Sequence, residues 1–188
     1  MFTYIQNEVD AHQLLFTQTI TSCKKTIAEA AEHVSRVLAA GGKVMLCGNG
    51  GSAADAQHIA TELSGRFRKE RKALAAIALT TDTSALTAIS NDYGYEQVFA
   101  RQVEAIAKPG DVLIGISTSG SSPNVLEAAK AAKAADCTVI SMTGEAGDSP
   151  LVAQANVAIQ IPSRDTARIQ EMHILAGHII CGWVENNL

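Results

Sequence analysis

Short apolar runs alternate along this chain with longer segments in which apolar residues recur at helical spacing. Each run is long enough for one buried strand, and the five of them lie at residues 43–47, 74–79, 112–116, 137–142 and 157–161. The segments between them are rich in alanine, and the last segment is a long helix. Strands that alternate with helices predict an α/β fold, with a five-stranded parallel sheet flanked by helices as in flavodoxin-like and Rossmann-like domains.

The first 40 residues precede the first run and show only helical spacing. Two helices fit this segment, with a break near residues 19–22 and a stop at the glycines 41–42. Helices placed before the first strand need a surface to pack against, and we expect a contact between subunits. No linker follows them, so the sequence predicts a single domain over residues 1–188, with a helical pair at 1–40 and an α/β core at 41–188.

Local signals place the ends of several other helices. Ser52 and Ser122 are suited to be N-caps, and Pro123 fits the first helical position after Ser122. Residues 91–94, Asn-Asp-Tyr-Gly, have the composition of a turn, and residues 96–107 have helical spacing.

Charge and composition exclude some classes of function. Acidic residues outnumber basic ones by 19 to 15, which gives a formal charge of −4, whereas a nucleic-acid backbone calls for clustered Lys and Arg. The N-terminus has neither the basic nor the apolar region of a signal peptide, and no uncharged apolar stretch reaches the roughly 18 residues of a membrane span. We therefore expect a soluble, cytoplasmic protein that binds neither nucleic acid nor membrane.

The four cysteines point to the same compartment. They lie far apart, at Cys23, Cys47, Cys137 and Cys181, with no Cys-x-x-Cys pair. Such cysteines are typical of small buried side chains in a reducing cytosol.

A glycine-rich loop follows the first strand. Three glycines at 48, 50 and 51 allow a tight turn and close approach of a ligand, and the helix after Ser52 presents its N-terminal N–H groups to the loop. A strand, a glycine loop and a helix N-terminus in this order suit an anion.

A second loop, at residues 117–124, is rich in serine and threonine hydroxyls and follows another strand. Because ligands of open parallel sheets sit beyond the carboxyl ends of the strands, we expect both loops at one edge. The alternative is an ordinary polar loop. The chain has no Gly-x-x-x-x-Gly-Lys-Ser/Thr, and no acidic residue follows the second strand where a dinucleotide ribose would need one. A monophosphate, as in a sugar phosphate, fits these loops better.

His58 and Glu62 are four residues apart and so lie on one face of the helix after the first loop. In the last helix, Gln170 and His178 also lie near one face. Together these four side chains form a plausible ligand set for zinc, although a solvated His–Glu pair is the commoner arrangement. His173 is offset from that face, and we expect it to be packed or at the surface.

Basic residues gather after the first motif helix, and a solvated connector is the simpler interpretation of this cluster. A rim that attracts a phosphorylated substrate is the alternative. The cluster comprises Arg66, Arg68, Lys69, Arg71 and Lys72.

Four motifs in sequence order carry a family resemblance. They are Cys-Gly-Asn-Gly-Gly-Ser at 47–52, Asn-Asp-Tyr-Gly at 91–94, Ile-Ser-Thr-Ser-Gly-Ser-Ser at 116–122 and Ala-Arg-Ile-Gln-Glu-Met-His at 167–173. Together they resemble the sugar isomerase (SIS) family, and within it the branch that isomerises sedoheptulose 7-phosphate. The resemblance covers nearly the whole chain, including the leading helices.

The resemblance implies an aldose–ketose isomerase that interconverts D-sedoheptulose 7-phosphate and D-glycero-D-manno-heptose 7-phosphate, in heptose biosynthesis for bacterial surface polysaccharide. It also implies a homotetramer with active sites at subunit contacts and one zinc ion per subunit. The implied zinc ligands are His58, Glu62, Gln170 and His178. The residues implied to bind substrate are Asn49, Gly50, Gly51, Ser52, Glu62, Asn91, Asp92, Ser117, Thr118, Ser119, Ser122 and Gln170.

The chemistry of such an isomerase agrees with these residues. The reaction needs a base beside the carbonyl, an acid for the oxygen and stabilisation of the enediolate. We expect Glu62 to be the base and His178 the acid, with zinc polarising the oxygens. One alternative is a tetrameric SIS scaffold that binds the replication initiator DnaA, a branch that lacks this pair. Another is a sugar-phosphate sensor, which would lack one of the two residues or carry a fused DNA-binding segment.

Overall fold

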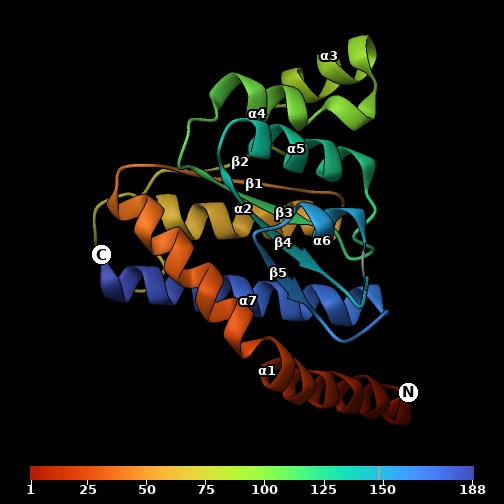
Figure 1. The fold of residues 1–188 in the computed structure, drawn as a ribbon. Helices are drawn as coiled ribbons and strands as arrows, with labels where there is room; N and C mark the ends of the chain where they lie inside the picture. Colours follow the sequence, from red (N-terminus) through yellow and green to blue (C-terminus); the bar gives the residue numbers. More distant parts are fainter. Residues whose placement is uncertain (148) are drawn as a thin grey trace.

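The computed structural model describes residues 1–147 and 149–188 and shows an all-parallel five-stranded sheet (Figure 1). Its strands follow the order β2-β1-β3-β4-β5, and every neighbouring pair is parallel. They are β1 (Val44–Gly48), β2 (Ala76–Ala78), β3 (Val112–Ile116), β4 (Thr138–Thr143) and β5 (Val157–Gln160). The predicted α/β fold is therefore confirmed, including the number of strands and their direction.

Helices cover both faces of the sheet, which explains why the central strands are continuously apolar (Figure 1). Side chains of β1 and β3 alternate between two apolar clusters, so that Leu46 faces one and Met45 the other. The first cluster is closed by α1 (Phe2–Ala39), α2 (Gly51–Ser64) and α7 (Thr166–Asn187). The second is closed mainly by α4 (Ala100–Ile106), α5 (Pro123–Ala134) and α6 (Pro150–Gln154), with α3 (Thr83–Tyr93) and the 3₁₀ helix η1 (Tyr95–Gln97) beside them.

The N-terminal segment is one continuous helix, so the prediction of two helices broken near residues 19–22 is wrong. Hydroxyls in the middle of α1 donate to carbonyls one turn back, from Thr17 to Gln13, from Thr21 to Thr17 and from Ser22 to Gln18. Such bonds bend a helix without ending it, and Figure 1 shows α1 changing direction between its dark red and orange parts.

Two other local predictions also need correction. The N-cap of α2 is Gly50, and Ser52 is buried inside the first helical turn. Residues 91–93 form the last turn of α3, and Gly94, whose φ is +88°, ends that helix. Residues 96–107 are divided between η1 and the shorter α4.

All four cysteines are buried and free, as predicted. Among the described residues, no helix has the length and apolar character to cross a membrane.

Candidate active site

The strand order creates a switch point between β1 and β3, where the loops leave a parallel sheet in opposite directions and ligands characteristically bind. A pocket of about 270 Å³ lies there, formed by the loops that follow these two strands and by the start of α7. It is lined by Asn49, Gly50, Gly51, Ser52, Ile116, Ser117, Thr118, Ser122, Thr166 and Gln170. Most of the residues predicted to bind substrate therefore share one pocket, together with Thr166, which the sequence analysis did not single out.

The glycine loop after β1 brings backbone to the wall of this pocket. Gly50 has a φ of +55°, a left-handed conformation that glycine adopts without strain, and it places the start of α2 at Gly51. A Cβ on Gly51 would lie 2.6 Å from the side-chain amide of Gln170. The absence of a side chain at residue 51 thus lets Gln170 of α7 reach the loop.

The loop after β3 presents a network of hydroxyls. Ser122 is the N-cap of α5, as predicted, but its hydroxyl lies 2.8 Å from the hydroxyl of the buried Ser117. The Ser119 hydroxyl lies 3.4 Å from that of Ser117 and accepts a hydrogen bond from the Ser121 hydroxyl at 3.0 Å. These rotatable donors and acceptors, with helix N-termini behind them, suit an anionic ligand.

A pair of asparagines joins the two loops. The amide of Asn49 donates to Asn124 and the amide of Asn124 donates to Asn49, both at 2.8 Å. Tyr95 also donates its hydroxyl to Asn49, at 3.1 Å. Asn124 is buried, and its position directly after Ser122-Pro123 was the one sequence signal that could have pointed to it.

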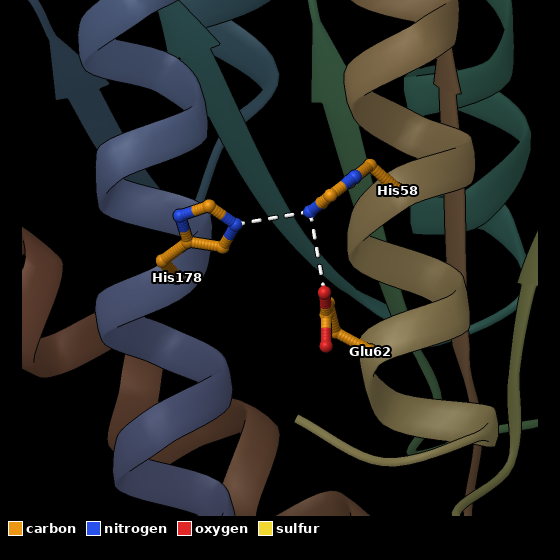
Figure 2. A group of neighbouring side chains, drawn as sticks. All are labelled: His58, Glu62 and His178. Carbon is orange, nitrogen blue, oxygen red and sulfur yellow. Dashed lines mark hydrogen bonds and ion pairs between the residues drawn. The ribbon is translucent and has the colours of Figure 1, made fainter. Parts of the chain in front are cut away.

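His58, Glu62 and His178 form a cluster between α2 and α7. Figure 2 shows the two α2 side chains and the α7 imidazole pointing toward one another. The His58 Nε2 atom lies 3.0 Å from the His178 Nε2 atom and 3.2 Å from the Glu62 carboxylate. One ligand atom from each residue lies within 4.8 Å of the other two.

This spacing suits a metal ion. Ligand atoms that lie about 2.0–2.1 Å from a tetrahedral zinc ion are about 3.3 Å from one another. The His58–His178 distance of 3.0 Å and the His58–Glu62 distance of 3.2 Å are close to this value. Two imidazoles and one carboxylate leave a position for substrate, which is characteristic of catalytic rather than structural zinc sites. Gln170, the fourth predicted ligand, contacts the glycine loop and lines the pocket.

The two helices can bring these ligands together because α7 has a glycine at the point of contact. A Cβ on Gly177 would lie 2.5 Å from the Cδ1 atom of Ile59, which is buried. Gly177 precedes His178 and Ile59 follows His58, so the close approach occurs directly beside the imidazole pair.

Two further titratable groups on α2 and α7 have shifted pKa values. Burial raises the pKa of Asp55, one turn before His58 on α2, to about 6, although His58 opposes the rise. One of its carboxylate oxygens is buried without a hydrogen-bond partner. The sequence analysis missed Asp55, although its spacing of three residues from His58 was a signal. Burial also lowers the pKa of His173 to about 4, so this neutral, packed imidazole can donate from Nε2 to the Thr143 carbonyl.

Asn91 and Asp92 lie away from this pocket. Both are exposed on the last turn of α3, where the Asn91 amide donates to Asp92 at 2.8 Å. Neither lines the pocket at the switch point, and their role in binding substrate stays a prediction.

A parallel sheet with a polar pocket at its switch point is typical of proteins that bind or act on small ligands such as phosphorylated compounds. A sequence profile described as the SIS domain matches residues 9–144. The chain belongs to the SIS domain family.

Several phosphoheptose isomerases are similar to this chain over nearly its whole length. The phosphoheptose isomerase of Helicobacter hepaticus is 53% identical over 186 residues, covering 99% of this chain and 94% of the relative. That of Campylobacter jejuni is 55% identical over 181 residues, covering 96% of each chain. The solved structure of phosphoheptose isomerase GmhA from Neisseria gonorrhoeae superimposes with a TM-score of 0.91 at 44% identity, covering 98% of both chains.

The contact at Gly177 gives a direct test of the cluster's geometry. Gly177→Ala should destabilise the fold by about 1–3 kcal/mol, because it overpacks a buried contact, and should weaken divalent-metal binding by moving His58 away from His178. Urea unfolding and a metal titration measure the two effects. In the double variant with Ile59→Ala, which removes the clashing atoms, the loss of stability should be smaller than the sum of the two single losses. Strictly additive losses would show that α2 and α7 do not need this close approach.

Proposed function

We propose that this protein is a phosphoheptose isomerase, which converts D-sedoheptulose 7-phosphate to D-glycero-D-manno-heptose 7-phosphate in heptose biosynthesis. The observation that carries the proposal is the His58–Glu62–His178 cluster on the same two helices, α2 and α7, whose first turns line a polar switch-point pocket. The chain also matches phosphoheptose isomerases over nearly its whole length. The compared proteins give no support to a scaffold that binds DnaA. The acid–base pair expected to be missing from such a scaffold is present here.

Glu62 and His178 fit the two proton-transfer roles. Glu62 takes a proton from the carbon beside the carbonyl while His178 gives a proton to the carbonyl oxygen, which yields the enediol. Glu62 then returns its proton to the former carbonyl carbon and His178 takes the proton of the other hydroxyl, so that the new carbonyl forms and both residues regain their starting states. The Glu62 side chain is only 18% exposed, which limits competition from water. The two residues come from different helices, Glu62 from α2 and His178 from α7.

His58, Glu62 and His178 are the residues that would hold a zinc ion, with Gln170 as a fourth ligand if its amide turns from the glycine loop. Two nitrogens and a carboxylate oxygen form a donor set that suits zinc. When bound, zinc supplies a Lewis acid for the carbonyl and hydroxyl oxygens of the sugar.

The phosphate group belongs in the pocket at the switch point. The backbone of Gly50 and Gly51 and the hydroxyls of Ser52, Ser117, Thr118 and Ser122 line this pocket and supply neutral donors. The Ser119 hydroxyl lies behind them, 3.4 Å from that of Ser117. Neutral donors and helix N-termini are sufficient for a monophosphate. Gln170 lines the pocket on α7, the helix that also carries His178, and is suited to orient the sugar.

A homotetramer is supported by apolar side chains that this single chain leaves exposed. A mostly apolar hollow of about 350 Å³ lies between α1 and α7, and its lining includes Ile20, Ile179 and Trp183. Ile179 and Trp183 are exposed, and so are Leu14 and Phe16 nearer the N-terminus of α1. Exposed apolar area of this kind is characteristic of subunit contacts. The four free cysteines and the sugar-phosphate substrate support a place in the cytoplasm.

Turnover of sedoheptulose 7-phosphate by the purified protein tests the function directly. We expect activity that a chelator removes and that added zinc restores. Activity that survives complete metal removal would reduce the proposed metal ligands to positioning roles. No turnover by the folded, zinc-loaded protein would contradict the proposed function.

Replacing the proposed base Glu62 should lower the rate of catalysis without affecting the fold. Glu62→Gln should retain the fold and the assembly and lose about 10²–10⁴-fold in kcat, the usual contribution of a general base. The matched control is Glu70→Gln, since the Glu70 side chain is 89% exposed and pairs with Arg66 only at 3.8 Å. Near-normal turnover by Glu62→Gln, measured beside this control, would remove Glu62 from the mechanism.

The assembly has its own test. Light scattering after gel filtration should give the mass of a tetramer, and Trp183→Glu should lower it, because a charge would then face the apolar hollow between α1 and α7. A monomeric wild-type protein, or a variant whose mass is unchanged, would contradict the role of this surface.

A further inference from the structure

The first part of the connection between α2 and β2, residues 65–72, which we call the 65–72 loop, is held by one buried carboxylate of α7. The Glu185 side chain is 2% exposed, although it lies near the C-terminal end of the chain. It accepts the backbone N–H of Phe67 at 3.0 Å and that of Arg68 at 2.9 Å. The Nε atom of Arg71 lies 3.6 Å from the same carboxylate. Glu185 therefore binds the loop at both ends of one short segment.

The carboxylate is charged at neutral pH. Burial alone would raise the pKa of Glu185, but the backbone N–H donors of Arg68, Lys69 and Phe67 and the Arg71 guanidinium outweigh it and hold the pKa below its usual range. Hydrogen bonds to a charged acceptor are about twice as strong as neutral ones. The negative charge of the Glu185 carboxylate thus strengthens the attachment of the 65–72 loop to α7.

The attached loop reaches both sides of the metal-binding cluster. The Phe67 ring stacks on the His178 imidazole, with centroids 5.5 Å apart and planes inclined by 27°. The Arg71 guanidinium donates to the backbone carbonyl of Glu62 at 2.6 Å. That carbonyl lies in the last turn of α2, where carbonyls lack helical partners. The Phe67 contact therefore orients the His178 imidazole, and the Arg71 contact fixes the turn of α2 that carries the Glu62 carboxylate.

We propose that Glu185 is a positioning residue for the metal centre. By holding the 65–72 loop, it sets the ring of His178 through Phe67 and the last turn of α2 through Arg71. The inference rests on the proposed function, and it assigns no contact between Glu185 and substrate. None of the residues that line the switch-point pocket belongs to this loop, so Glu185 should affect metal binding and kcat and leave binding of the phosphate unchanged.

The test compares Glu185→Gln with Glu70→Gln, the same change at an exposed position of the same loop. Glu185→Gln keeps the shape of the side chain and removes the charge that attracts Arg71. Zinc affinity is measured by competition with a chromophoric chelator, at a temperature well below unfolding. We expect the dissociation constant for zinc to rise by about 10–100-fold in Glu185→Gln, as for other residues that orient metal ligands. KM for sedoheptulose 7-phosphate should be unchanged while kcat falls, and Glu70→Gln should match the wild type.

A second variant keeps the test decisive if Glu185→Gln fails to fold. Phe67→Leu removes the stacking on His178 and retains an apolar side chain, while the backbone N–H bonds to Glu185 are kept. It should also bind zinc more weakly than the wild type. Folded variants that bind zinc with wild-type affinity would overturn the inference, because a merely structural role lowers stability alone. Failure of the wild-type protein to bind zinc is a separate result, since it would overturn the metal centre of the proposed function and this inference with it.

Discussion

The candidate centre depends on how closely α2 and α7 approach each other. His58 and Glu62 come from α2, and His178 comes from α7, more than a hundred residues later in the sequence. A single missing Cβ at Gly177 lets the two helices meet beside them. The packing around that point is dense, because Ile59, Met172, Ala176 and Ile180 are all buried. Protein interiors of this density transmit small displacements rather than absorbing them. The distance between the two imidazoles is therefore set by the apolar core and not by the imidazoles themselves.

The sheet supplies the other half of the site. Because β1 and β3 are neighbours and parallel, the loops that follow them open at the same edge, at the point where the strand order reverses. The glycine loop contributes backbone and the serine loop contributes hydroxyls, and the asparagine pair fixes one against the other. Helix α7 connects the two halves, because Gln170 lines the pocket and His178 lies two turns further along in the cluster.

Much of the fold could be predicted from the sequence, because a strand buried on both faces leaves a continuous apolar run. β3 begins and ends at the predicted residues, 112 and 116. β2 is shorter than predicted because it lies at the edge of the sheet, where Ile77 is 44% exposed. The break in α1 was wrong because Thr and Ser hydroxyls that weaken a helix locally can also bond within it.

The site was predictable only where its residues follow a local pattern. Spacing placed His58 and Glu62 on one face, and the hydroxyl-rich loop was visible as composition. Glu185, Phe67 and Arg71 carried no such signal, because their contacts join segments more than a hundred residues apart in the sequence or depend on a loop without regular structure. Asp55 was missed because its burial, and hence its raised pKa, arises only from tertiary packing.

The paired amides of Asn49 and Asn124 have a consequence for how this chain can evolve. Each amide donates to the other and accepts from it, so the two side chains match only as a pair. An aspartate at either position would set two acceptor oxygens against each other and add a negative charge at the contact between the two loops. We therefore expect positions 49 and 124 to covary among related sequences, because a substitution at one position alone would be selected against.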